Sequence, residues 1–452
     1  MRSRSCTNLL LKMLLAVMLA LCSVDLSAAT IEIEVSSVAD SGDGSLRAAL
    51  ELAAAMPDLP VRIHFGPSDG LFSTPQLIEL ASPLPAVRGE VTIDGFLRNV
   101  LWRAYGATIS GADRHRIFKV TETGNLRLSG ITLQHGHSDT GGAILNRGRL
   151  ELEGVSLLNN GAEGNGGAVA NQGELWIINS TLAWNRSRRG GGLAHLTGQA
   201  RLINVTLFRN FAETAASVFS TGHLHIANSL LAGDPELSHC INTGSLSTGT
   251  THNLIQGAHE GCGEPVLTVD PGIEDRLGYY NGPTPTLPIG GASPVVNLGL
   301  NEAAVNARGQ LLRWDQRGNG DPRFAGGFTD LGAFERQGHL PTEFLVDIME
   351  DNGLRACSMI APADCPLRAA IELASKARSM TPILFHSAIF DTPQVLVLPE
   401  LPQTGNTAIL LDGQDTAGIT IFVPRPVSWL TQGPVQIKIG HDTGSRDDER
   451  DH

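Results

Sequence analysis

The sequence predicts an all-β protein whose main body is a right-handed parallel β-helix, a solenoid with coils of about 25 residues. Three observations support this prediction. A glycine-rich pattern repeats along the chain, 51 glycines accompany only 5% aromatic residues, and no long segment has helical periodicity. A chain of 452 residues is long enough for two domains, but a solenoid can use that length in one elongated body.

The first thirty residues are typical of an export signal. A basic start is followed by an apolar run from Leu14 to Leu21, which is too short to cross a bilayer, and residues 27–29 are small. We therefore expect residues 1–29 to be a signal peptide. The protein would then be secreted or at the cell surface, with the periplasm as an alternative. We expect no membrane insertion after cleavage, because no later segment is long and apolar enough.

Charge and composition narrow the possible partners. The formal net charge of −13 argues against nucleic acid and against an anionic membrane as the main partner. It does not argue against a polysaccharide or a surface protein, and these are the partners that we expect. No cofactor-binding motif is visible, so we expect no cofactor.

The cysteines predict disulfides. Two of the six fall in the signal peptide, and an even number in an exported chain favours bridges. Their spacing favours the pairs Cys240–Cys262 and Cys357–Cys365. A zinc site is the alternative, but no Cys-x-x-Cys and no matching histidine pair supports it, so we expect no metal site.

The repeat is clearest in the middle of the chain. The pairs Gly141-Gly142, Gly166-Gly167 and Gly191-Gly192 recur at an interval of 25 residues. Each pair precedes two or three short strands with small turns between them, which indicates a β-solenoid. One asparagine closes each coil at the same interval, at positions 160, 185 and 210. We expect these asparagines to hydrogen-bond to one another from coil to coil.

A solenoid needs a cap, because an open end exposes unpaired strand edges. Residues 31–35 alternate as a strand, and a helix is expected from about Leu46 to Met56 with Ser45 as its N-cap. We interpret this strand and helix as the N-terminal cap.

Several segments, in this order, carry a resemblance to a known family: residues 39–49, 92–95, 270–271, 281–286, 293–297, 315–318 and 330–335. They resemble the secreted β-helix proteins that have a CSLREA-type N-terminal motif and a choice-of-anchor C-terminal segment, within the pectate-lyase-like architecture. The resemblance covers residues 31–336. It implies the fold and export, and it implies no settled activity. The chain departs from the motif at Gly44, where the family has cysteine, and at Ala48, where it has glutamate.

The motif then occurs a second time, at residues 364–374 and 410–413. Cys365 restores the cysteine of the motif. The predicted organisation is therefore a β-helix with its cap at residues 30–336, a linker at 337–343, a second cap-like module at 344–430 and a polar tail at 431–452. The module is either the start of a truncated second solenoid or a unit that packs against the first.

Candidate functional residues form a charged stripe before the glycine pairs. Stacking should place Ser138, Glu163 and Arg188 in one column about 4.8 Å apart, with Glu213 continuing it. We expect these residues in loops that vary from coil to coil, which is where binding sites commonly lie. The catalytic candidates are His137, Asp139, Glu163, Arg188 and Glu213. The interpretation that we prefer is a solvated ladder of ion pairs, with Arg188 held between Glu163 and Glu213, which contributes little energy.

Three hypotheses for function remain open. The first is a non-catalytic scaffold for adhesion or for binding glycans or proteins. The second is a polysaccharide lyase or a glycoside hydrolase, which rests mainly on analogy of fold. The third is a structural component of the cell envelope. Carboxylates that converge in a groove would favour an enzyme, and a flat, paired ladder would favour binding.

Overall fold

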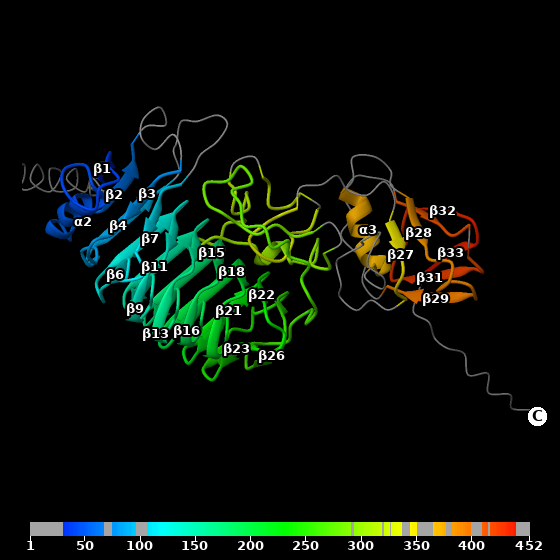
Figure 1. The fold of residues 1–452 in the computed structure, drawn as a ribbon. Coiled ribbons are helices and arrows are strands. Elements are labelled where there is room, and N and C mark those ends of the chain that lie inside the picture. The colour runs from blue at the N-terminus through cyan, green and yellow to red at the C-terminus, as the bar shows by residue number, and fades with distance from the viewer. Residues whose placement is uncertain are drawn as a thin grey trace, which may run out of the picture.

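The computed structural model describes residues 30–66, 75–95, 106–290, 293–318, 321–325, 327–336, 344–349, 365–376, 382–398, 409–414 and 416–439. They form an all-β solenoid of about 11 turns built from parallel sheets, which confirms the predicted fold class. Figure 1 shows the coils stacked along one axis from the blue N-terminal strands to the green ones. The predicted signal peptide lies outside the described residues.

The strands stack in four rows, which we number in the order that follows. The first row contains β1 (Ile31–Val35), β2 (Val61–Phe65), β4 (Glu90–Asp94), β7 (Asn125–Ser129), β11 (Arg149–Glu153), β15 (Glu174–Ala183), β18 (Gln199–Phe208), β21 (His223–Ala227) and β24 (Ser245–Leu246). The second row contains β3 (Leu77–Glu79), β5 (Thr108–Ser110), β8 (Thr132–Gln134), β12 (Ser156–Leu158), the second halves of β15 and β18, β22 (Leu230–Ala232) and β25 (Leu254–Ile255). The third row contains β6 (Phe118–Val120), β10 (Ile144–Asn146), β14 (Val169–Asn171), β17 (Leu193–His195), β20 (Val218–Ser220), β23 (Ser238–Asn242) and β26 (Ala258–Glu260). The fourth row contains β9 (His137–Thr140), β13 (Gly161–Asn165), β16 (Arg186–Arg189) and β19 (Phe211–Thr214).

The core lies inside the coils. In each strand, alternate side chains point inward, and parallel pairing brings equivalent apolar residues together. Leu150, Leu175 and Ala200 form one such column, and all three are 0% or 1% exposed. Each coil thus covers the apolar face of the next, which is why the repeat predicts the fold.

The sharp corner between the first and second rows needs a residue in the left-handed conformation. Gly154 adopts φ +63° there, and Asn179 and Asn204 adopt +45° and +52° in the next two coils. Glycine and asparagine take this conformation at the lowest cost. The corner explains why one of these two residues stands between the strands of each central coil.

The predicted asparagine ladder is present. Asn160 donates to Oδ1 of Asn185 at 3.0 Å, and Asn185 donates to Oδ1 of Asn210 at 2.9 Å. All three residues are 0% to 2% exposed. The ladder satisfies buried polar groups at a corner that would otherwise leave them unpaired.

A second ladder contains a histidine. Asn146 donates to Asn171 at 2.6 Å, and Asn171 lies 2.9 Å from Nδ1 of His195. Nε2 of His195 lies 3.2 Å from the carbonyl oxygen of His223. The ring therefore accepts at Nδ1 and donates at Nε2, which requires its neutral form. Burial of this fully covered ring lowers the pKa of His195 to about 4.

We expect His195 to make folding sensitive to acid. The folded pKa of about 4 lies below the ordinary value of 6.5, so the stabilisation is complete above pH 6.5 and is lost as the pH falls toward 4. The full loss would be about 3 kcal/mol. When the pH is lowered from 7 to 4.5, the urea midpoint of His195→Asn should fall less than that of the wild type. His137→Asn, at a partly exposed position, is the control, and equal pH slopes in wild type and His195→Asn would contradict the prediction.

One interval in the repeat differs from the prediction. Ile144 pairs with Val169, but Val169 pairs with Leu193, so the third coil begins one residue earlier than the constant interval predicts. The left-handed glycine of that coil is Gly190, with φ +65°, rather than Gly191. Three consecutive glycines at this point make the shift invisible in the sequence.

The N-terminal cap is confirmed. Helix α2 (Leu46–Ala55) follows β1, and the side chain of Ser45 accepts a hydrogen bond from the backbone of Ala48. Arg47 contacts Asp40 at 2.6 Å and donates to the carbonyl oxygens of Ser82 and Pro83, each at 2.8 Å. Arg47 therefore ties the helix to the chain that enters the first coils.

The disulfide Cys240–Cys262 is present and links β23 to the chain just after β26, at the last coil of the third row. Cys357 lies outside the described residues, so its pairing with Cys365 stays a prediction.

A layer of mostly irregular chain, residues 266–336 with the gaps given above, covers part of the outside of the solenoid. It includes the short helix η2 (Asn301–Ala303). We call it the covering layer. Its apolar residues, such as Leu287, Leu298 and Leu331, pack against the second row. The buried side chain of Gln316, in this layer, donates to Ser156 at 2.9 Å and accepts from Thr181 at 2.6 Å.

The second module repeats the topology of the first coils. It contains β27 (Phe344–Val346), α3 (Leu367–Lys376), β28 (Pro382–Phe385), β29 (Gln394–Val397), β30 (Leu410–Asp412), β31 (Ile419–Val423), β32 (Leu430–Gln432) and β33 (Val435–Ile439). Its sheets run β27-β28-β30-β32 and β29-β31-β33, as β1-β2-β4-β7 and β3-β5-β8 do in the first body. Most of its apolar residues form a core of their own.

The predicted start of the polar tail at residue 431 is wrong. Apolar and polar residues alternate from Val435 to Ile439, and this segment forms β33, which pairs with β31. The second module therefore includes strands that follow its cap, where the sequence predicted a cap alone.

Candidate functional site

The charged stripe predicted from the sequence lies in the fourth row, in strands and not in loops. His137 and Asp139 are in β9, Glu163 in β13, Arg188 in β16 and Glu213 in β19. The predicted column is only partly formed. Ser138 pairs with Ala162 instead of Glu163, because β13 carries one more residue than β9 between its paired positions.

The stripe is open to solvent. Arg188 lies 3.5 Å from Glu213, and both side chains are about 70% exposed. Within the described residues, no ion pair joins Arg188 to Glu163. Arg186 stacks on Phe211, with 4.5 Å between guanidinium and ring centre. None of the five catalytic candidates lines either of the two hollows on the outer face of the first row. Of the solvated ladder predicted from the sequence, the described residues therefore show the pair Arg188–Glu213.

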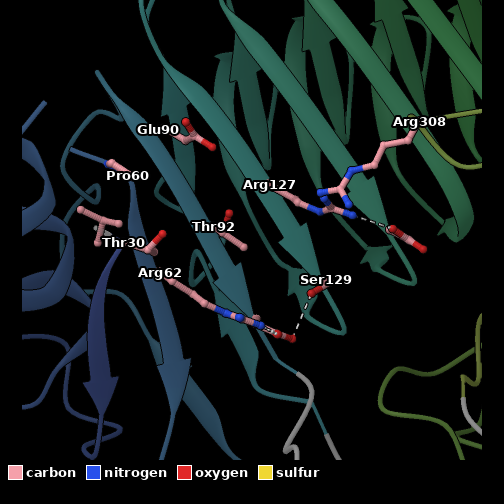
Figure 2. Close-up of a pocket in the computed structure, with 11 residues that line it drawn as sticks. Thr30, Pro60, Arg62, Glu90, Thr92, Arg127, Ser129 and Arg308 are labelled. Carbon is pink, nitrogen blue, oxygen red and sulfur yellow. Dashed lines mark hydrogen bonds and ion pairs between the residues drawn. The ribbon is translucent and has the colours of Figure 1, made fainter. Parts of the chain in front are cut away.

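A groove lies elsewhere, on the outer face of the first row. It has a volume of about 450 Å³, and a second hollow of about 220 Å³ shares four of its lining residues. Its floor consists of outward side chains from neighbouring strands, among them Arg62 (β2), Thr92 (β4) and Arg127 (β7). Figure 2 shows these side chains rising from successive strands, with Arg308 of the covering layer entering from the opposite side.

Ion pairs across strands order the floor. Arg62 pairs with Asp94, which also accepts from Ser129 at 3.1 Å. Arg127 contacts Glu151 at 2.9 Å and Glu153 at 3.1 Å. The side chains of Asp94 and Glu151 are only 12% and 11% exposed. The floor is therefore a rigid array of alternating donors and acceptors.

Glu151 has a shifted titration. Burial raises the pKa of its carboxyl group, and the neighbouring Glu153 raises it further, while Arg127 and Arg308 act in the opposite direction. A glycosidase needs one free carboxylic acid and one free carboxylate near the substrate bond. Here one arginine holds both glutamates, which suits binding of hydroxyl groups better than proton transfer.

The groove was not predicted from the sequence. Its residues alternate with the inward apolar residues of the strands, as Glu151 does between Leu150 and Leu152. Aligning the outward positions of Val61–Phe65, Glu90–Asp94, Asn125–Ser129 and Arg149–Glu153 would have shown a charged column. Nothing in the sequence around Arg308 indicated that its side chain lines the groove.

Several other features bear on function. Among the described residues, no group of three or more histidine, cysteine, aspartate or glutamate side chains is arranged to hold a metal ion. Asp113 contacts His135 at 3.1 Å, at a turn on the surface. No helix in the described parts of the chain is long and apolar enough to cross a membrane.

No family model matches the chain, and no curated protein matches its sequence.

Proposed function

We propose that this protein is exported and acts as a non-catalytic scaffold. Its ligand is an extended polar chain, a polysaccharide, which binds in the groove of the first strand row. The observation that carries the proposal is the ordered array of paired donors and acceptors on a rigid sheet. Sugar hydroxyls both donate and accept hydrogen bonds, so an array of both kinds suits them.

Export is supported by the signal-like N-terminus and by the disulfide Cys240–Cys262, since disulfides persist in oxidising compartments. The non-catalytic reading is supported by the ion pairs that hold Asp94, Glu151 and Glu153. A polysaccharide is preferred to a surface protein because charged side chains, among them Arg62, Asp94 and Arg127, line the groove, whereas the core of a protein interface is depleted in charged residues.

We expect Thr92→Trp to weaken binding to a glycan array. Thr92 lies on the floor, and an indole there would fill the groove. The matched control is Thr108→Trp, which adds the same side chain to β5 in the second row, outside the groove. Affinity should fall at least about tenfold in Thr92→Trp and stay at the wild-type level in Thr108→Trp.

The same samples should be examined for products by mass spectrometry. Intact glycans that bind to the wild type and not to Thr92→Trp would support a scaffold. Shortened or unsaturated products that disappear in Thr92→Trp would contradict the non-catalytic reading, and an absence of any bound glycan would contradict the proposed ligand class.

A further inference from the structure

One wall of the groove is a hairpin of the covering layer, residues 304–312. Val305 pairs with Leu311 in an antiparallel bridge, and the backbone of Leu312 donates to Ala304 at 2.8 Å. Ala304 and Leu312 are buried against Ile178 and Ile203 on the outer face of β15 and β18. The root of the hairpin is therefore fixed by an apolar cluster beside the groove.

The tip of this hairpin is also ordered. Oδ1 of Asn306 accepts from the backbone of Arg308 at 2.9 Å and from that of Gln310 at 3.1 Å. Gly309 adopts φ +75° and completes the turn. These bonds fix the backbone of Arg308 at the mouth of the groove, and its side chain lines both hollows.

Arg308 differs from the other arginines of the groove. Arg62, Arg127 and Arg149 each lie within 4.0 Å of a carboxylate. Among the ion pairs of the described residues, none includes Arg308. A guanidinium held at a groove mouth without an acidic partner has a free set of donors.

Two guanidinium groups approach the same part of the groove. Figure 2 shows the Arg308 side chain descending from the hairpin toward Arg127, and both arginines line both hollows. Both also act electrostatically on the carboxyl group of Glu151. Arg127 is already paired with Glu151 and Glu153, whereas no ion pair of the described residues neutralises Arg308. The positive charge of Arg308 is therefore available to a further anion in this part of the groove.

We propose that Arg308 and Arg127 form an anion subsite, so that the groove selects an acidic saccharide whose carboxylate or sulfate group binds between the two guanidiniums. This inference rests on the proposed function and names the ligand class of the same groove. Arginine binds planar and tetrahedral oxyanions through paired N–H donors, which gives both affinity and orientation. Arg127 contacts both glutamates through Nη2, so its Nε and Nη1 can orient the anion from the floor, and Arg308 contacts it from the wall.

The test compares wild type and Arg308→Gln on an array of neutral, uronate-containing and sulfated oligosaccharides. The control is Arg313→Gln, an exposed arginine of the same layer that stacks on Trp314 and does not line the groove. We expect binding to be confined to acidic glycans and to weaken about tenfold in Arg308→Gln, with no change in Arg313→Gln. The comparison of uronates with sulfates shows which oxyanion fits.

The possible outcomes separate the two proposals. Binding confined to neutral glycans, or acidic binding that Arg308→Gln leaves unchanged, would overturn the anion subsite while the groove remains a glycan site. Reducing the carboxyl groups of a uronate oligosaccharide that binds should lower its affinity as much as Arg308→Gln does. Equal affinity before and after reduction would also overturn the subsite. An array without any bound glycan would overturn both proposals.

Discussion

Asn185→Ala is expected to lower the free energy of unfolding by about 3–5 kcal/mol. The side chain is 0% exposed and makes four hydrogen bonds, two with Asn160 and one each with Leu157 and Asn210. Alanine would leave buried donors and acceptors on both neighbouring coils without these partners. The urea midpoint would measure the loss, and hydrogen exchange should locate it in the coils around β16.

Asn159→Ala is the matched control. Asn159 stands in the adjacent coil, next to the ladder, and is exposed with φ +53°. Its replacement removes no ladder bond and should cost about 1 kcal/mol, the strain of alanine in the left-handed conformation. Asn185→Asp should be at least as harmful as Asn185→Ala near neutral pH, because a carboxylate faces the oxygens of Leu157 and Asn210. If Asn185→Ala and Asn159→Ala lower the midpoint equally, the ladder does not stabilise the solenoid.

The ladder belongs to the part of the fold that the sequence could predict. The signals for the coil, the cap and the ladder are local: glycines at turns, Ser45 before a helix and asparagines at a constant interval. Each of these residues acts through its own backbone conformation or through its equivalent in the next coil. A repeat therefore reveals them without knowledge of distant contacts.

The candidate site depends on strand register and on contacts between distant segments, which the repeat does not reveal. A single extra residue in β13 moves Glu163 out of line with Ser138, and no pattern in the sequence reports it. Groove residues become neighbours only when the register of the first row is known, as for Arg127 and Glu153. Arg308 reaches them because residues 304–312 pack on β15 and β18, a contact between distant parts of the chain. The predicted stripe was visible because its residues recur at the interval of the glycine pairs, and that is unrelated to whether it encloses a ligand.

Arg323→Met is expected to release the covering layer, with a loss of about 3–5 kcal/mol. Arg323 is 0% exposed, pairs with Glu335 at 3.1 Å and donates to the side chain of Asn179 at 2.9 Å. Methionine keeps much of the volume but removes the cation, so the buried carboxylate of Glu335 loses this partner. Hydrogen exchange should rise in residues 293–336, whereas the coils that carry the asparagine ladder should keep their protection.

The pH dependence of the stability loss in Arg323→Met is a sharper test than the magnitude of that loss. Burial raises the pKa of Glu335 well above its ordinary value and the pKa of Asp330 to about 6. Folding therefore favours the protonated carboxyl groups. As the pH rises from 4 to 6, Asp330 ionises in the unfolded chain before it ionises in the folded one, so the free energy of unfolding falls over this range. Without Arg323 this penalty is larger, so the variant should be closer to the wild type at pH 5 than at pH 8.

Two further variants distinguish a charge effect from a packing effect. The double variant Arg323→Met/Glu335→Gln removes the buried charge and should recover part of the lost stability, with a flatter pH dependence. Arg313→Met, at an exposed arginine of the same layer, should change the unfolding midpoint little. Equal protection of residues 293–336 in Arg323→Met and Arg313→Met would show that the buried ion pair does not hold the layer. Because this layer carries the hairpin with Arg308, its release should also weaken ligand binding in the groove.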